Sequence, residues 1–387
     1  MQLEKIPRQV ELWFFDPSTS GPTDEDRTWW ADPSNPHNPF YNFIGNPTAV
    51  RRLCRAAKIA FSRYNRDCSD QAFAILGPAS TGKTTLAKMF AKLIGLPFVE
   101  VDANACNTVT DIVIAINKAL ENIESHDEEF PTLELQELGD GKLVVPPCIV
   151  FIDEVHNLPK KVEQELLKAT EWDDARLIAP GADGTSWDID TSAICWLIAT
   201  TDRGDLFSAF DTRFSKIHLN LYTKEEMAQI IQVHNPDWDL ETCEIVARYA
   251  GRVPREALAF AREMRLESDA LDDSWENIAA RIAEDNHIDQ FGMTYQRLSV
   301  LSALGHGPIA RSNLGGVIGC KEAELTKFVM PPLLSATADQ LPLVKITSKG
   351  YCLTQAGAKE LEKRNIPFNS DAFGNTSLST RLHKNQN

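Results

Sequence analysis

Residues Gly77-Pro78-Ala79-Ser80-Thr81-Gly82-Lys83-Thr84-Thr85 fit the pattern G-x-x-x-x-G-K-[ST] of a phosphate-binding loop. The glycines allow a tight turn that points successive backbone N–H groups at a bound phosphate. Lys83 can reach the β- and γ-phosphates of a nucleotide, and Thr84 can place its hydroxyl on Mg²⁺. The stretch therefore predicts a site for a nucleoside triphosphate such as ATP.

The sequence on both sides of the loop supports this interpretation. Residues 71–76 are mostly apolar and predict a buried strand, while Thr85–Ile94 has the apolar spacing of a helix. The loop would then open a helix whose N-terminus attracts anions. A chance glycine-rich turn is the alternative, and it does not account for a strand before the loop and a helix after it.

Two carboxylates follow a second apolar run. Cys148-Ile-Val-Phe-Ile-Asp-Glu154 has the form of a buried parallel strand that delivers acids to its carboxyl end. Asp153 can hold Mg²⁺ beside the phosphate loop. Glu154 is placed to polarise the water that attacks the γ-phosphate, although the pair could instead cap the next helix.

A third apolar run, residues 194–201, ends in hydroxyl side chains. Alternation of such strands with helices predicts a doubly wound α/β core with a parallel sheet, flanking helices and ligands at the strand carboxyl ends.

Composition narrows the class of protein. The 387 residues are 43% hydrophobic and 24% charged, which is ordinary for a globular chain of two or three domains. No apolar run reaches the length of a membrane span, and the first residues lack a signal peptide's apolar core. The eight cysteines form no C-x-x-C pair, and Cys148 and Cys195 lie in apolar strands. We therefore expect buried free thiols, a cytoplasmic location and no membrane partner.

Charge is unevenly distributed along the chain. Residues 1–290 hold 28 Lys and Arg against 49 Asp and Glu, a balance of −21, whereas residues 291–387 hold 11 against 6, a balance of +5. A basic C-terminal part on an acidic body is what a localised contact with a polyanion requires. The alternative, ordinary surface charge, stays open on charge alone.

Changes of pattern divide the chain into five segments. Residues 1–38 predict an irregular arm, and an acidic insertion at 124–141 predicts a solvated surface loop. From Thr223 the pattern is all-helical, and from Met293 three short helices precede two short strands around Ser348-Lys349-Gly350, which suggests a winged helix. The expected domains are the arm 1–38, an ATPase core 39–222, a helical lid 223–290, a winged helix 291–366 and a disordered tail 367–387.

An ordered set of motifs resembles the RuvB family of AAA+ ATPases, which are Holliday-junction branch-migration motors. The resemblance covers roughly residues 40–360. It rests on Phe43-Ile-Gly-Asn46, the phosphate loop, Asp153-Glu-Val-His-Asn-Leu158, Ile198-Ala-Thr-Thr201, Asp211-Thr-Arg-Phe214, Leu221-Tyr-Thr-Lys-Glu-Glu-Met-Ala228, Gly251-Arg-Val-Pro-Arg255, and the two winged-helix stretches Lys327–Leu334 and Ile346–Thr354.

The resemblance implies an ATP hydrolase that works as a hexameric ring. Thr201 would sense the γ-phosphate, Arg213 would be an arginine finger reaching into the neighbouring subunit, and Arg255 would be the second sensor on the lid. With Lys83 and Glu154 these are the expected catalytic residues. The expected nucleotide-binding residues are Ile44, Gly45, Gly77, Ala79, Ser80, Thr81, Gly82, Lys83, Thr84, Thr85 and Arg255, and the expected metal ligands are Thr84 and Asp153.

The winged helix implies contacts with branched or duplex DNA. The residues expected to make them are Arg311, Lys345, Lys349 and Tyr351. The sequence departs from the family here, because the positions of the family's wing arginines are Ile346, Lys349 and Tyr351, so one cation remains.

A hairpin predicted at 175–190 stands where the family docks its partner RuvA. Leu177, Ile178 and Trp187 would form such a contact, or would pack against the chain's own core.

Two functions remain open from the sequence. The first is an ATP-driven DNA translocase or helicase acting on branched DNA in recombination or repair. The second is an ATP-gated assembly switch that recruits a nuclease or recombinase without translocating. A protein unfoldase ranks last, because residues 100–107 lack the aromatic-hydrophobic-glycine pore loop that such enzymes need.

Overall fold

The structure is a computed structural model. It describes residues 32–61, 71–121, 124–127, 130–132, 136–137, 142–171, 174–180, 186–201, 212–269 and 273–369, and the backbone alone for those between 124 and 137. The arm's residues 1–31, the tail from 370 onward, Asp211 and the turn at 181–185 lie outside the described residues. The chain forms two compact units: one runs to Leu219 without the loop Pro78–Thr81, and the other contains that loop and the chain from Asn220.

A five-stranded sheet forms the centre of the first unit. All its pairings are parallel, in the order β11-β1-β10-β7-β2. The strands are β1 (Phe73–Leu76), β2 (Phe98–Asp102), β7 (Cys148–Asp153), β10 (Ile194–Thr200) and β11 (Ser215–His218). Successive residues of a strand face opposite sides, so Val150 and Phe151 belong to different core clusters. Both faces are buried, which explains the unbroken apolar runs.

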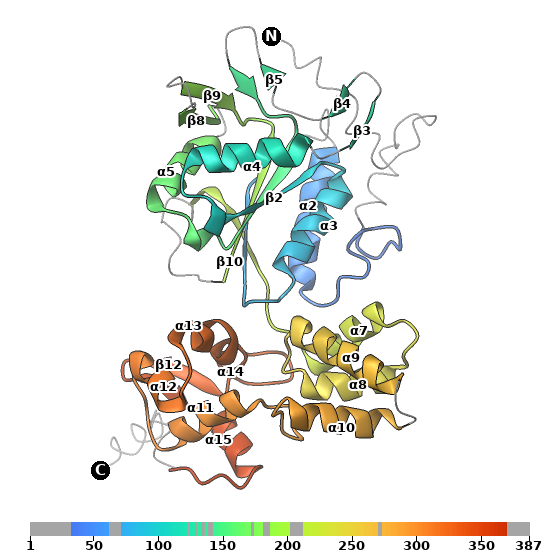
Figure 1. Cartoon of the computed structure of the whole chain (residues 1–387), viewed down its shortest axis with the longest axis vertical. Coiled ribbons are helices and arrows are strands. Elements are labelled where there is room, and N and C mark those ends of the chain that lie inside the picture. Colours follow the sequence, from blue (N-terminus) through green and yellow to red (C-terminus); the bar gives the residue numbers. More distant parts are fainter. Residues whose placement is uncertain are drawn as a thin grey trace, which may run out of the picture. The chain divides into compact units, whose positions relative to one another are not determined.

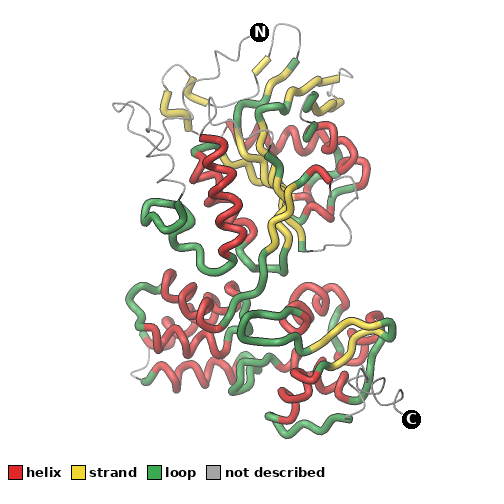
Figure 2. The backbone as a smooth tube through the Cα atoms, turned by 180° about the vertical axis from the view of Figure 1, so that it is seen from behind, coloured by secondary structure: helices red, strands yellow, loops and turns green. Residues whose placement is uncertain are grey.

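Helices cover both faces of this sheet, as Figure 1 and, from behind, Figure 2 show. On one face pack α2 (Pro47–Phe61) and α3 (Lys83–Ile94). On the other pack α4 (Val109–Glu121), α5 (Lys160–Ala169) and the short 3₁₀ helices η3 (Ala103–Ala105) and η4 (Val155–Asn157). The predicted α/β core is confirmed.

The acidic insertion was predicted as a loop, and this was wrong. It contains β3 (Glu124–Asp127) paired with β4 (Phe130–Thr132), and β5 (Gln136–Glu137), which pairs with β6 (Leu143–Val144) just after the insertion. Strand β6 in turn pairs with β9 of the hairpin, giving a second sheet in the order β5-β6-β9-β8. Pairing between segments far apart in the sequence therefore provides the order that local composition did not predict.

The predicted hairpin is present as β8 (Arg176–Pro180) and β9 (Ser186–Asp190), paired antiparallel. Leu177 is 1% exposed in the core, and Trp187 is partly buried against the same core. Ile178 points the other way and is 46% exposed. Leu177 and Trp187 thus pack against the chain's own core, which was the alternative to a partner contact. Of the three residues, Ile178 alone has an apolar side chain that faces outward.

The second unit begins with four helices around one core: α7 (Lys224–His234), α8 (Leu240–Tyr249), α9 (Pro254–Ser268) and α10 (Trp275–Asp285). Capping side chains at the N-termini fix where three of these helices begin. Thr223 and Glu226 form a capping box at α7, Asp239 caps α8, and Ser274 caps α10. We call these helices the helical bundle.

The rest of the second unit, which we call the C-terminal module, combines helices with a two-stranded sheet. Its helices are α11 (Tyr295–Gly305), α12 (Arg311–Ile318), α13 (Glu322–Glu324), the π-helical segment η5 (Leu325–Val329), α14 (Met330–Leu334) and α15 (Gln355–Glu362). Strands β12 (Val344–Thr347) and β13 (Gly350–Leu353) pair antiparallel through the two-residue turn Ser348-Lys349. Ile309 forms a bridge to Tyr351 on the other side of β13. Figure 2 shows the sheet in yellow beside these helices.

A buried arginine joins this module to the bundle within the second unit. Arg297 of α11 is 5% exposed and donates to Glu256 of α9 at 2.8 and 3.1 Å. It also donates to the carbonyl of Phe328 at 3.4 Å. That carbonyl belongs to the π-helical segment η5, so Arg297 also contacts this segment within the module.

Within the described residues, every helix is too short or too polar to cross a lipid bilayer. The seven cysteines in the described part of the chain are free thiols, and Cys148 and Cys195 are buried, as predicted from their apolar surroundings.

Candidate nucleotide-binding site

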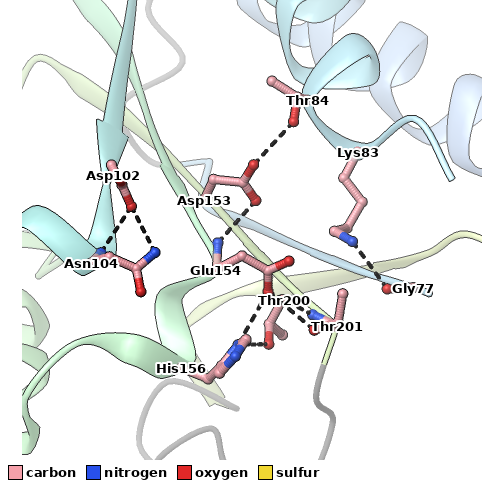
Figure 3. Close-up of polar contacts among 10 residues, drawn as sticks. All are labelled: Gly77, Lys83, Thr84, Asp102, Asn104, Asp153, Glu154, His156, Thr200 and Thr201. Carbon is pink, nitrogen blue, oxygen red and sulfur yellow. Dashed lines mark hydrogen bonds and ion pairs between the residues drawn. The ribbon is translucent and has the colours of Figure 1, made fainter. Parts of the chain in front are cut away.

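The carboxyl ends of three adjacent strands carry the predicted active groups. Strand β10 lies between β1 and β7, with Leu76 opposite Thr200 and Ile198 opposite Ile152. The residues that follow each strand are therefore neighbours. Figure 3 shows them at one edge of the sheet.

The phosphate loop turns from β1 into α3 through backbone that favours glycine. Gly82 caps α3 with φ 86° and ψ 22°, and Ser80 also has a positive φ of 61°. Lys83 is only 6% exposed, and its Nζ donates to the carbonyl of Gly77 at 3.2 Å. Burial of an ammonium group is costly unless anions or carbonyls face it, so the loop is built around a buried cation at the N-terminus of a helix.

Thr84 and Asp153 form the predicted metal pair. Thr84 Oγ1 donates to Asp153 Oδ2 at 3.1 Å. Burial raises the pKa of the Asp153 carboxyl, against hydrogen bonds from the Glu154 N–H and Thr84 that favour its charged form. A hydroxyl beside a half-buried carboxylate is the oxygen donor set that Mg²⁺ takes with phosphate oxygens. These residues fit the ion, because its charge would offset the desolvation of Asp153.

Glu154 and Thr201 also meet. The Glu154 Oε2 atom accepts from the Thr201 hydroxyl at 3.1 Å and lies 3.4 Å from the Thr201 N–H. His156, which the sequence reasoning assigned no role, places its Nδ1 atom 3.3 Å from the same oxygen and 2.8 Å from Thr200 Oγ1. The sequence signals for His156 were its position two residues after the glutamate and its place in the family-like stretch Asp153–Leu158.

Asp102 ends the neighbouring strand and is opposite Asp153 in the sheet. Its Oδ1 accepts from the backbone N–H and the side-chain amide of Asn104, both at 2.9 Å, and so caps η3. The carboxylate acts locally in the turn (Figure 3).

The other residues predicted to bind nucleotide differ in burial. Gly77 is buried after β1, and Thr81 is fully buried with its hydroxyl donating to the Pro78 carbonyl at 2.9 Å. Ala79 is half-buried, and Thr85 is exposed in the first turn of α3. Ile44 and Gly45 are half-buried just before α2.

The two predicted arginines lie on other elements than the strand ends that carry this cluster. Arg213 is exposed and pairs with Glu171 at 3.2 Å, while the adjacent Phe214 is buried in the core and fixes the backbone there. Arg255 is exposed in the first turn of α9, in the second unit. Both roles remain predictions.

The predicted DNA-contacting residues lie in or beside the two-stranded sheet of the C-terminal module. Lys349 is exposed in the turn of the hairpin, and Lys345 is half-buried on β12. Tyr351 differs from the prediction of a direct contact: it is 7% exposed in the core, and burial raises the pKa of its hydroxyl. The exposed Arg311 guanidinium lies 5.9 Å from the Tyr351 ring, so the ring supports this cation instead.

Comparisons with known proteins agree with this geometry. Residues 73–221 match the model of the ATPase family associated with various cellular activities (AAA). The chain is similar in fold to the RuvB Holliday junction branch migration motor of Thermotoga maritima, with a TM-score of 0.62, 22% identity, and 83% of this chain and 95% of that chain covered. A lysine-to-arginine mutant of that RuvB gives a TM-score of 0.63 at the same identity and coverage. No curated protein matches the chain.

Proposed function

We propose that this chain hydrolyses ATP and uses the energy to move branched or duplex DNA, as a RuvB-type motor. The observation that carries the ATPase part is the meeting of the phosphate loop, Asp153, Glu154 and Thr201 at one sheet edge, within the segment that matches the AAA model. The DNA part rests on the RuvB-like fold and on the basic C-terminal module.

Nucleotide binding follows from the loop. The backbone N–H groups at the start of α3 face an anion, and the buried Lys83 supplies the positive charge beside it. Thr84 and Asp153 would hold Mg²⁺, which when bound neutralises charge on the phosphate oxygens.

Hydrolysis needs a base and a charge stabiliser. Glu154 accepts the proton of the attacking water, and the Thr201 hydroxyl fixes the carboxylate beside the γ-phosphate position. Charge that develops on the transferred phosphoryl group needs a further cation. Arg213, exposed and held at the surface by Glu171, would supply it to a neighbouring subunit in a ring, most simply a hexamer.

DNA binding is assigned to the C-terminal module, where the helices and the two-stranded sheet β12–β13, which would be the wing, support the winged-helix interpretation. Lys349 in the wing turn and Arg311 above Tyr351 would contact phosphates. Arg255 on α9 would pass the nucleotide state to the bundle, which Arg297 ties to the module. For a RuvA-like partner on the hairpin, Ile178 is the exposed apolar contact.

The second candidate is the ATP-gated assembly switch. The wing favours it, because Ile346 is an exposed apolar residue and Tyr351 is buried at positions where RuvB proteins carry arginines. Such a protein would bind DNA or a partner in the ATP state and recruit an effector without moving.

The two functions are separated by an assay on a labelled four-way junction. A motor converts the junction to duplex arms with MgATP, and Glu154→Gln abolishes the conversion while junction binding persists. A switch leaves the junction intact at every protein concentration, yet binds it more tightly with ATP than with ADP. Conversion that is equally fast in Glu154→Gln would contradict both.

A further inference from the structure

Glu154 adopts a backbone conformation that is unusual for its residue type. Glu154 follows the last residue of β7 and has φ 49° and ψ 47°. These angles lie in the left-handed region, which residues other than glycine, asparagine and aspartate rarely adopt. Its N–H donates to Asp153 Oδ1 at 2.9 Å. Such a conformation is strained and persists where surrounding contacts fix it. The turn thus sets the direction of the Glu154 side chain.

Among the described residues, the side-chain contacts of Glu154 use one carboxylate oxygen. Oε2 receives the Thr201 hydroxyl, lies near the Thr201 N–H, and lies 3.3 Å from His156 Nδ1. Figure 3 shows His156, Thr200 and Thr201 converging on one side of the carboxylate. Oε1 is then the oxygen that can face water.

The chemistry of the groups fixes where the hydrogen sits. A carboxylate only accepts hydrogen bonds, so the position of Oε2 3.3 Å from His156 Nδ1 favours the tautomer with its hydrogen on Nδ1. The same nitrogen lies 2.8 Å from the hydroxyl of Thr200, a residue with 0% exposure. The imidazole is 13% exposed. The buried Thr200 hydroxyl therefore orients the ring, and the ring in turn orients the Glu154 carboxylate.

We propose that His156 is a positioning residue for Glu154. Its Nδ1–H and Thr201 hold Oε2, so that Oε1 is presented to the attacking water as the proton acceptor. This inference rests on the proposed ATPase function. Within that function it assigns to His156 the orienting of the Glu154 carboxylate, which the phosphate loop and the two acids do not provide.

The test depends on which ring nitrogen of His156 contacts the Glu154 carboxylate. In His156→Asn the side-chain amide nitrogen takes the place of Nδ1, whereas in His156→Gln it takes the place of Nε2. We expect His156→Ala and His156→Gln to lower kcat for ATP by about tenfold or more, since a misplacement near 1 Å costs up to ~100-fold. His156→Asn should keep kcat within about threefold. KM for ATP, the Kd for a fluorescent ATP analogue, and Tm should agree among Asn, Gln and wild type.

Three results would overturn the proposal. One is an unchanged kcat in His156→Ala. A second is an equal loss in His156→Asn and His156→Gln at matched Tm, which would assign the ring a packing role. A third is a raised kcat in His156→Ala, which would mean that the histidine restrains the glutamate. A wild-type chain that binds but does not hydrolyse ATP would instead refute the proposed function.

Discussion

The nucleotide site and the wing of the C-terminal module use charged residues in opposite ways. At the sheet edge Lys83 is 6% exposed, and Asp153 and Glu154 are held by hydroxyls from neighbouring segments. In the wing Lys349 is exposed in a two-residue turn and Arg311 lies at the surface over a tyrosine. Charges that are buried and partnered depend on one geometry, whereas solvated charges act by attraction over distance. Substitutions at the first region should therefore have steep effects and those at the second shallow ones.

The largest effect is expected from Arg213→Ala. An arginine that stabilises the transferred phosphoryl group contributes on the order of 10³-fold or more to turnover. We expect that loss with nearly intact nucleotide affinity. The matched control is Glu171→Gln, which removes the surface partner of Arg213 and should leave turnover within about twofold, because exposed ion pairs contribute little.

Mixing tests whether Arg213 acts on a neighbouring subunit. Subunits carrying Arg213→Ala and subunits carrying Glu154→Gln, each inactive alone, should recover hydrolysis in mixed rings, where some interfaces pair both intact residues. Absence of recovery in rings proven mixed by labelling would place Arg213 outside the neighbour's site and weaken the comparison.

Glu154→Gln should reduce hydrolysis by about 10²- to 10⁴-fold, the range of a lost general base. An amide keeps the shape but cannot take the proton of water. Binding of a fluorescent ATP analogue should persist in this variant and be lost in Lys83→Ala, which removes the buried cation of the loop. Hydrolysis by Glu154→Gln at the wild-type rate would show that another group activates water.

The ion pair between Arg297 and Glu256 joins the helical bundle to the C-terminal module. It is a buried charge outside the nucleotide site, and we expect effects of intermediate size from its substitution. Glu256→Leu leaves Arg297 buried without its carboxylate, and we expect a loss of about 2 kcal/mol, less than for a fully buried pair because Glu256 is 40% exposed. Arg297→Met leaves a glutamate that water can solvate, and should cost about 1 kcal/mol. Thermal unfolding should show the larger drop in Tm for Glu256→Leu, and the reverse order would contradict this assignment.

The smallest effect is expected from Lys349→Glu. Loss of one phosphate contact should weaken duplex binding at low salt and reduce the salt slope of log K by about one. Lys161→Glu, the same charge change at an exposed site on α5 of the first unit, is the control and should leave the slope unchanged. ATP hydrolysis without DNA should be the same in both. Anisotropy titrations that give equal slopes for the two variants would remove the wing from the DNA site.

The sequence predicted which motifs meet at the candidate nucleotide site, because strand order brings distant segments together at one edge. The loop helix was predicted at Thr85–Ile94 and found at Lys83–Ile94. Segments that depend on distant pairing were not predictable in this way. Strand β5 of the acidic insertion joins a sheet with β9 through β6, and the role proposed for His156 needs Thr200 on another strand. The local sequence pattern also did not predict that the side chains of Leu177 and Tyr351 are buried in the core.

The central claim is that DNA bound to the C-terminal module is coupled to hydrolysis at the sheet edge. Its most direct test is the steady-state rate of MgATP hydrolysis by the wild-type chain, alone, with duplex DNA and with a four-way junction, at low salt. We predict a higher rate with DNA, highest with the junction, and a smaller stimulation in Lys349→Glu at equal basal rate. Basal hydrolysis that no DNA changes at any concentration would contradict the motor and favour the assembly switch.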